Sequence, residues 1–265
     1  MENEHQESSQ GESPKPRSRG IYLLPNLLTT AALFSGFYAI VAAMQGKFEV
    51  AAIAIFIAMI LDGLDGRVAR MTNTQTAFGA EYDSLADLVS FGLAPGLTMY
   101  QWALVHMNEM GTGWGKAGWL AAFVYVACAA LRLARFNTQI GKTDKRFFVG
   151  LPSPTAAALM AGMVWVFHDL DLNGRSLQIP ALIMTMAAGL LMVSNLSYYS
   201  FKDLNLRNKV PFVVMIAILI GFALTTLDPP KVLFGFFLLY TLSGPVIWVN
   251  RRYRRWQRRK KDISA

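Results

Sequence analysis

The feature that most constrains this chain is a series of long apolar segments separated by short polar ones. Most of these segments run for about 18 residues or more with few charges, the length a helix needs to cross a hydrocarbon core about 30 Å thick. In the whole sequence 54% of residues are hydrophobic and only 16% are charged. We therefore predict an integral membrane protein, an all-α polytopic bundle of transmembrane helices.

Eight segments fit this pattern. We expect spans near residues 22–44, 49–70, 84–106, 117–137, 153–169, 178–195, 209–227 and 231–250. Residues 21–250 are predicted to form one membrane domain. Residues 1–20, which are rich in polar residues, are expected to be a disordered cytoplasmic tail, and residues 251–265 a basic cytoplasmic tail.

The basic residues fall almost entirely on one side of this topology. Of the 25 Lys and Arg residues, 21 lie in the two tails or in the loops on the same side, and the others are Lys47, Lys116, Arg175 and Lys231. Because cytoplasmic loops are enriched in Lys and Arg, we predict that both termini are cytoplasmic. The C-terminal sequence RRYRRWQRRKK is interpreted as a contact with anionic membrane lipids, and no nucleic-acid partner is predicted.

Four aspartates lie at the ends of two of the predicted spans, in the segment DGLDGRVARMTNTQTAFGAEYDSLAD (residues 62–87). Asp62 and Asp65 are three residues apart, and Asp83 and Asp87 are four apart, so each pair shares one helix face. An aspartate costs about 2.5–3.5 kcal/mol at the centre of a spanning helix, and four together also repel one another. The cluster therefore requires compensating positive charge.

Two divalent cations would balance the four carboxylates. Ligation by oxygen alone favours Mg²⁺ or Mn²⁺ over zinc, which prefers His and Cys, and the segment contains neither. Arg67 and Arg70 are expected to offset part of the negative charge.

Four small residues lie between the aspartates in the sequence. We interpret them as leaving space for a bulky ligand to approach the backbone, and close packing between helices is the alternative. They are Gly63, Gly66, Ala69 and Gly79.

The same residues resemble the signature of the CDP-alcohol phosphatidyltransferase family. The pattern Asp62-x-x-Asp65-Gly66-x-x-Ala69-Arg70, eight residues, then Gly79-x-x-x-Asp83-x-x-x-Asp87 agrees at every fixed position. The stretches DSLADLVSFGLAPG, RLARFN (132–137) and FVGLPSPTAA (148–157) are similar to the branch that uses serine, the membrane-integral type of phosphatidylserine synthase. The resemblance covers roughly residues 20–200. It implies transfer of the phosphatidyl group of CDP-diacylglycerol to the hydroxyl of L-serine, giving phosphatidylserine and CMP.

The resemblance also implies roles for individual residues. Asp62, Asp65 and Asp83 would hold the metal pair against the diphosphate, and Asp87 would lie near the metals and act as the general base. CDP-diacylglycerol would lie against Gly66, Ala69, Arg70 and Gly79.

Two further pairs of residues are weaker candidates. Asn26 and Thr29 resemble a polar pair that borders the nucleotide pocket, although an N-terminal helix cap would explain them equally well. Arg132 and Arg135 are candidates for binding the serine carboxylate. The resemblance further implies a homodimer. We expect the protein in the bacterial inner (plasma) membrane, and the predicted topology places the active site at its cytoplasmic face.

Two alternatives remain open from the sequence. The acceptor could be another alcohol, such as glycerol 3-phosphate. The chain could instead be a cation or proton-coupled transporter, because carboxylates within a membrane also mark ion pathways. The chemistry of phosphatidylserine synthases that resemble phospholipase D is excluded, because none of the three histidines has the H-x-K spacing.

Overall fold

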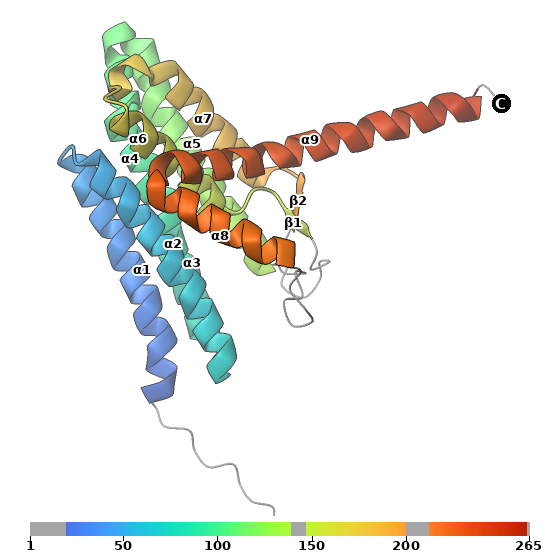
Figure 1. Ribbon diagram of the computed structural model, residues 1–265. Coiled ribbons are helices and arrows are strands. Elements are labelled where there is room, and N and C mark those ends of the chain that lie inside the picture. The colour runs from blue at the N-terminus through green and yellow to red at the C-terminus, as the bar shows by residue number, and fades with distance from the viewer. Residues whose placement is uncertain (1–19, 139–146, 200–211, 264–265) are drawn as a thin grey trace, which may run out of the picture.

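The computed structural model describes residues 20–138, 147–199 and 212–263. These residues form a bundle of helices (Figure 1). The helices are α1 (Gly20–Met44), α2 (Phe48–Thr72), α3 (Ala77–Asp87), α4 (Ala94–Trp102), α5 (Thr112–Thr138), α6 (Ser153–Asp169), α7 (Gln178–Val193), α8 (Phe212–Leu227) and α9 (Pro229–Ile263).

The third predicted span is a composite of several helical turns. It begins with α3, continues through a π-helical turn, η1 (Leu88–Leu93), and α4, and ends in a 3₁₀ turn, η2 (Leu104–Met110). It starts at Ala77 rather than near residue 84, because the Thr76 hydroxyl accepts a hydrogen bond from the backbone N–H of Gly79 and caps the helix.

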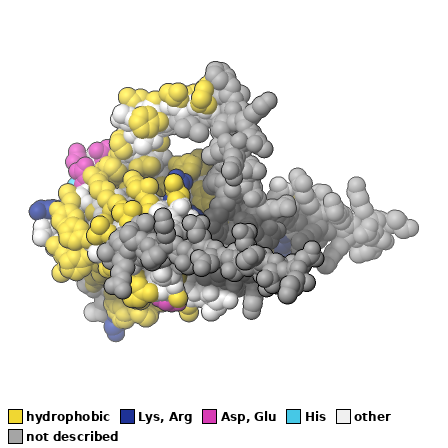
Figure 2. Space-filling view, turned by 90° about the horizontal axis from the view of Figure 1, so that it is seen from below, with side chains coloured by type: hydrophobic (Ala, Val, Ile, Leu, Met, Phe, Trp, Pro, Cys, Tyr) yellow, Lys and Arg dark blue, Asp and Glu magenta, His cyan; other side chains and the backbone are white. Residues whose placement is uncertain are grey.

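The described residues confirm a helical membrane protein. Four helices are long and apolar enough to cross a membrane, namely Leu24–Met44, Ala77–Met110, Thr112–Thr138 and Pro229–Asn250, and α7 is a shorter apolar helix. Hydrophobic side chains cover much of the described surface in Figure 2. Phe34, Phe222 and Leu239 are each more than two-thirds exposed, which suits contact with lipid. The count of eight spans and the cytoplasmic placement of the termini stay predictions.

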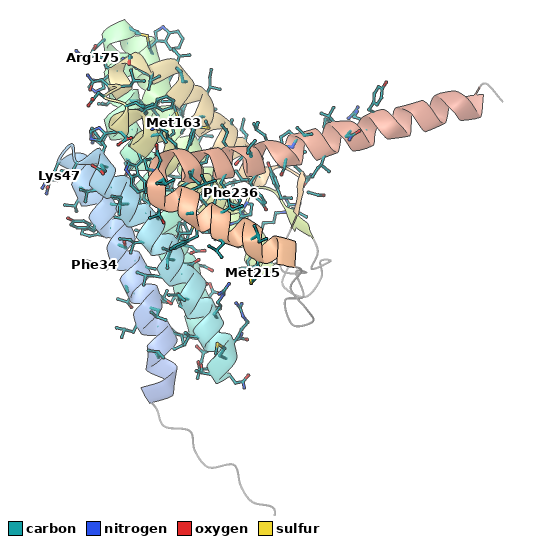
Figure 3. All side chains as sticks on the ribbon, in the orientation of Figure 1. Phe34, Lys47, Met163, Arg175, Met215 and Phe236 are labelled. Atoms are coloured by element: carbon teal, nitrogen blue, oxygen red, sulfur yellow. The ribbon has the colours of Figure 1, made fainter. Side chains whose placement is uncertain are left out.

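Three of the loops predicted to lie outside meet at one end of the bundle. The rings of Phe48 and His168, which lie beside the α1–α2 and α6–α7 connections, are 6.3 Å apart. Arg175, in the 3₁₀ turn η3 (Gly174–Ser176), pairs with Glu109 of η2. Figure 3 shows Lys47 and Arg175 away from the end at which α2 turns into α3. The helix directions therefore agree with the predicted alternation.

A small sheet at the other end was not predicted. Strands β1 (Phe147–Val149) and β2 (Ser197–Tyr199) pair antiparallel, which joins the segment after α5 to the segment after α7. Gly150 follows β1 with a positive φ of 84° and donates its N–H to the carbonyl of Leu196 at 2.8 Å. The basic residues predicted for cytoplasmic loops at 139–146 and 200–211, and those of the N-terminal tail up to residue 19, lie outside the described residues.

The last helix passes across the bundle and projects beyond it (Figure 1). Its first half packs on α6, where a Cβ added at Gly162 would lie 3.2 Å from the Cα of Phe234. Helix α9 continues to Ile263, so the sequence that we predicted as a basic tail from residue 251 begins as an extension of this helix.

Replacement of Gly150 by alanine should destabilise the protein more than the same change at Gly46. Both glycines have a positive φ, which costs an L-residue about 1–2 kcal/mol. Only at Gly150 would the added Cβ also collide with backbone, at 2.2 Å from the carbonyl oxygen of Met192; at Gly46 nothing lies within 4 Å. The apparent Tm of the two variants in detergent measures the difference. Equal Tm values for the two variants would show that the backbone at Gly150 can move away from Met192 without loss of stability.

Candidate active site

The predicted carboxylates come together where α2 and α3 lie against one another. One carboxylate oxygen from each of Asp62, Asp83 and Asp87 lies within 4.8 Å of the others. The side chains of Asp62 and Asp87 approach each other closely. The helical spacing of three and four residues therefore gives the shared faces that we expected.

A tight turn between α2 and α3 sets this geometry. Helix α2 ends at Thr72 and is capped by Asn73, which adopts the left-handed conformation with a φ of 51° and donates its N–H to the last carbonyls of the helix. Thr76 then caps α3. The reversal takes only residues 73–76, so the chain returns immediately and Asp83 comes to face Asp62.

Asp65 occupies a separate position beside this group of three. Its side chain is buried, and its Oδ2 accepts a hydrogen bond of 2.7 Å from the hydroxyl of Thr29 on α1. Asp65 also interacts electrostatically with Asp62 and Asp83. Thr29 thus fixes the fourth carboxylate within reach of the other three.

The alternative interpretation of Asn26 and Thr29 as a helix cap is wrong. Helix α1 begins at Gly20, so both residues lie inside it. The structure places Asn26 next to the signature, because a Cβ added at Gly79 would lie 3.4 Å from its Oδ1.

Open space lies beside the small residues of α2. A Cβ added at Gly63 would meet nothing within 4 Å, and one at Gly66 would meet only the tip of the Arg70 side chain at 3.9 Å. Ala69 is half-buried on the same helix. This arrangement favours access for a ligand over close packing of helices at these positions.

The carboxylate group has the properties of a divalent-cation site. Two carboxylates 4.8 Å apart repel by roughly 3 kcal/mol at an effective dielectric constant of about 20. Oδ1 of Asp83 is buried and has no hydrogen-bond partner. A buried acceptor without a partner is costly, and a hard cation with oxygen ligands would both satisfy it and remove the repulsion. These residues therefore fit a bound divalent metal ion.

The cation nearest to the general-base candidate comes from another helix than we expected. In the described part of the chain, neither Arg67 nor Arg70 lies within ion-pair distance of an aspartate, and both are exposed. Arg132 of α5 interacts electrostatically with Asp87. Neither Arg67 nor Arg70 therefore forms an ion pair with the carboxylates, and the expectation that they offset part of the charge stays a prediction.

The two candidate arginines for serine binding differ in their surroundings. Arg132 donates a hydrogen bond to the hydroxyl of Ser153 at the start of α6 and lies beside Asp87. Arg135 donates to Oδ1 of Asn195 at 2.8 Å. The structure therefore brings Arg132 to the aspartates, whereas Arg135 ties α5 to the end of α7.

Other polar residues support the site and were not predicted. Nδ2 of Asn137 donates to the hydroxyl of Ser84, which lies between two of the aspartates, at 3.0 Å. Asn137 and Ser153 belong to the stretches RLARFN and FVGLPSPTAA, and polar groups inside otherwise apolar stretches are the signal that could have identified them.

Comparison with known proteins assigns the chain to a family. The model of the CDP-alcohol phosphatidyltransferase family matches residues 22–196, which include the four aspartates and Arg132. The chain belongs to this family. A relative from Helicobacter pylori (strain J99), named CDP-diacylglycerol–serine O-phosphatidyltransferase, is 37% identical over 86% of this chain and 92% of its own length.

Relatives of this enzyme family also occur among archaea. A Methanocaldococcus jannaschii protein with the same name is 29% identical over 88% of this chain and 97% of its own length. An archaetidylserine synthase from Methanothermobacter thermautotrophicus is 33% identical over 66% of this chain and 69% of its own length.

Replacement of Asp83 by asparagine should weaken metal binding. An amide lacks the negative charge of the carboxylate, so we expect the affinity for Mn²⁺ to fall by about tenfold or more, equivalent to about 1.4 kcal/mol. Titration of the purified protein with Mn²⁺, followed by electron paramagnetic resonance, measures the affinity without any substrate. Asp171→Asn is the matched control, since Asp171 is exposed in the α6–α7 loop. Equal affinities for the two variants would exclude Asp83 as a ligand.

Proposed function

We propose that this protein transfers the phosphatidyl group of CDP-diacylglycerol to the hydroxyl of L-serine and releases CMP. The observation that carries the proposal is the convergence of three signature carboxylates, from α2 and α3, with the partly buried guanidinium of Arg132. The names of the bacterial and archaeal relatives, which specify serine transfer, support the choice of acceptor.

The nucleotide end of the lipid substrate would bind on the α1–α3 side of the site. The open surface at Gly66 and Ala69 leaves room for it, with Arg70 at its edge as a partner for phosphate oxygens. Gly79 and Asn26 would form the opposite border. Thr29 would act indirectly, by holding Asp65 in place.

The four aspartates would hold a pair of divalent ions, Mg²⁺ or Mn²⁺. Asp62, Asp83 and Asp87 form the compact group, and Asp65 adds a fourth carboxylate beside it. When bound, these ions would neutralise the diphosphate and stabilise CMP as the leaving group.

The residues of the chain itself would supply the acid–base chemistry and the position of the acceptor. Arg132 would pair with the carboxylate of serine, which places the serine hydroxyl near Asp87. Asp87 would take the hydroxyl proton as the serine oxygen forms a bond to the phosphorus that carries diacylglycerol. The bond between this phosphorus and the CMP oxygen breaks, and its electron pair leaves with CMP. A positioned base of this kind contributes typically about 10²–10⁴-fold.

The membrane arrangement is part of the same proposal. We place eight spans in a bacterial inner membrane, with both termini and the active site at the cytoplasmic face and two copies of the chain in a homodimer. The meeting of alternate loops at one end of the bundle supports the alternation of the spans. Family membership favours an enzyme over the cation or proton-coupled transporter.

CMP release by the purified protein in detergent tests the function. With CDP-diacylglycerol and Mg²⁺ or Mn²⁺, we expect release to require L-serine and to stop when the metal is chelated. Release that depends instead on glycerol 3-phosphate would keep the aspartate chemistry but exclude serine as the acceptor. If no alcohol supports CMP release, the proposal of an enzyme is rejected, and a cation or proton-coupled transporter becomes the favoured hypothesis.

The Asp87→Asn variant tests the assignment of the base. An amide cannot accept the hydroxyl proton, so kcat should fall by about 10²-fold or more. Steady-state CMP release measures the change, and Asp171→Asn again serves as the control. Near-full turnover by Asp87→Asn would exclude Asp87 as the general base.

A further inference from the structure

The span that carries Asp83 and Asp87 changes its helical geometry immediately after Asp87. Helix α3 ends at this residue, and the π-helical turn η1 follows it directly. In η1 the N–H of Ala94 donates to the carbonyl of Val89, five residues earlier, instead of four as in an α-helix. Because a π turn contains more residues than an α turn, η1 sets the rotation of α3, with its two aspartates, relative to α4.

Pro95 explains why the helix widens at this position. A proline inside a helix has no N–H to donate to the residue four positions earlier, and its ring collides with the carbonyl of that residue. Pro95 stands in the first turn of α4, and the residue four positions before it is Phe91, in η1. The carbonyl of Phe91 is therefore displaced from its regular position and needs a donor other than Pro95.

Tyr125 of α5 supplies this donor. Its hydroxyl donates to the carbonyl of Phe91 at 2.9 Å. Both residues are almost completely buried, so the loss of this hydroxyl would leave a buried acceptor without its donor. The close approach of α5 depends on Gly96, because a Cβ there would lie 3.2 Å from the side chain of Val126 and 3.5 Å from the ring of Tyr125.

A second hydrogen bond holds η1 from α1. The hydroxyl of Ser90 donates to the carbonyl of Ala32 at 3.1 Å. Gly36 lets the two helices approach, because a Cβ there would lie 2.7 Å from the Cα of Ser90. Polar contacts from both α1 and α5 therefore fix the widened turn next to Asp87.

We propose that Tyr125 is a positioning residue for the carboxylate site. By holding the carbonyl of Phe91, it fixes the turn that orients Asp83 and Asp87 toward Asp62. This inference rests on the proposed function and deepens it, because it adds a residue of the helical core to those that set the positions of the carboxylates.

The Tyr125→Phe variant of the full-length protein tests the proposal, because it removes the hydroxyl and keeps the ring. We expect the affinity for Mn²⁺, measured by electron paramagnetic resonance without substrate, to fall by about fivefold, within the effect of losing one hydrogen bond. At saturating Mn²⁺ the kcat should fall by about tenfold, because Asp87 is displaced. The KM for L-serine should stay within about twofold of the wild type.

Tyr198→Phe is the matched control. Tyr198 is equally buried, and its hydroxyl also donates to a backbone carbonyl, that of Thr241 in α9 at 3.2 Å. Both variants should lower the Tm by a similar amount, and only Tyr125→Phe should lower the affinity for Mn²⁺. Equal affinities for the two variants would overturn the proposal and show that Tyr125 only stabilises the fold.

A double-mutant cycle with Pro95→Ala tests the route through the carbonyl of Phe91. The alanine supplies an N–H to this carbonyl, so in the Pro95→Ala background the Tyr125→Phe change should alter the affinity for Mn²⁺ by less than about twofold. Independent, additive losses from the two substitutions would overturn the proposed route.

If Tyr125→Phe does not fold, Ser90→Ala provides the test. It removes the hydrogen bond from η1 to α1 and should lower the affinity for Mn²⁺ by about threefold. An unchanged affinity would reject the role of the turn.

The proposed function can fail separately from this inference. A wild-type protein that releases no CMP with serine would show the proposed function to be wrong, and the affinities for Mn²⁺ would still decide the role of Tyr125. A serine-dependent wild type, with Mn²⁺ affinity and kcat unaffected by Tyr125→Phe, would reject only the role of Tyr125.

Discussion

The mutual repulsion of four carboxylates at one place in an apolar bundle is the constraint on which the rest of the structure depends. Three of them lie within 4.8 Å of one another, and the fourth is held beside them by Thr29. Charges this close are not stable without positive partners in surroundings of low dielectric constant. The chain supplies Arg132 from α5 and leaves Oδ1 of Asp83 without a protein donor, and we propose that metal ions balance the remaining charge.

The site thereby divides into two sides that meet at Asp87. Helices α1 to α3 present the signature residues and the open surface beside Gly66, which suits a nucleotide diphosphate. The end of α5 and the start of α6 provide Arg132 and its partner Ser153, which suits an anionic acceptor. We propose that Asp87, which interacts with both Asp62 and Arg132, takes the proton of the incoming hydroxyl.

Local spacing explains what could be predicted from the sequence. Aspartates three and four residues apart must share a helix face, so the pairing of Asp62 with Asp83 and Asp87 followed once α2 and α3 were predicted to be neighbours. Long-range contacts could not be predicted in this way. The partner of Asp65 lies 36 residues earlier in the chain, and Asn137 donates to Ser84 across a separation of 53 residues. The short pairing of β1 with β2 and the π-helical turn after Asp87 also depend on tertiary contacts. Neither element has a sequence pattern from which it could be predicted.

The most direct measurement is anomalous X-ray scattering from crystals grown with Mn²⁺ and CDP-diacylglycerol. We predict at least one manganese peak bonded to oxygens of Asp62, Asp83 and Asp87, with the diphosphate of the lipid on the same ion. The anomalous signal locates the manganese, and the carboxylate oxygens bonded to it identify its ligands. A bound diphosphate with no metal at these three carboxylates would contradict the role of the aspartates on which the proposed reaction depends.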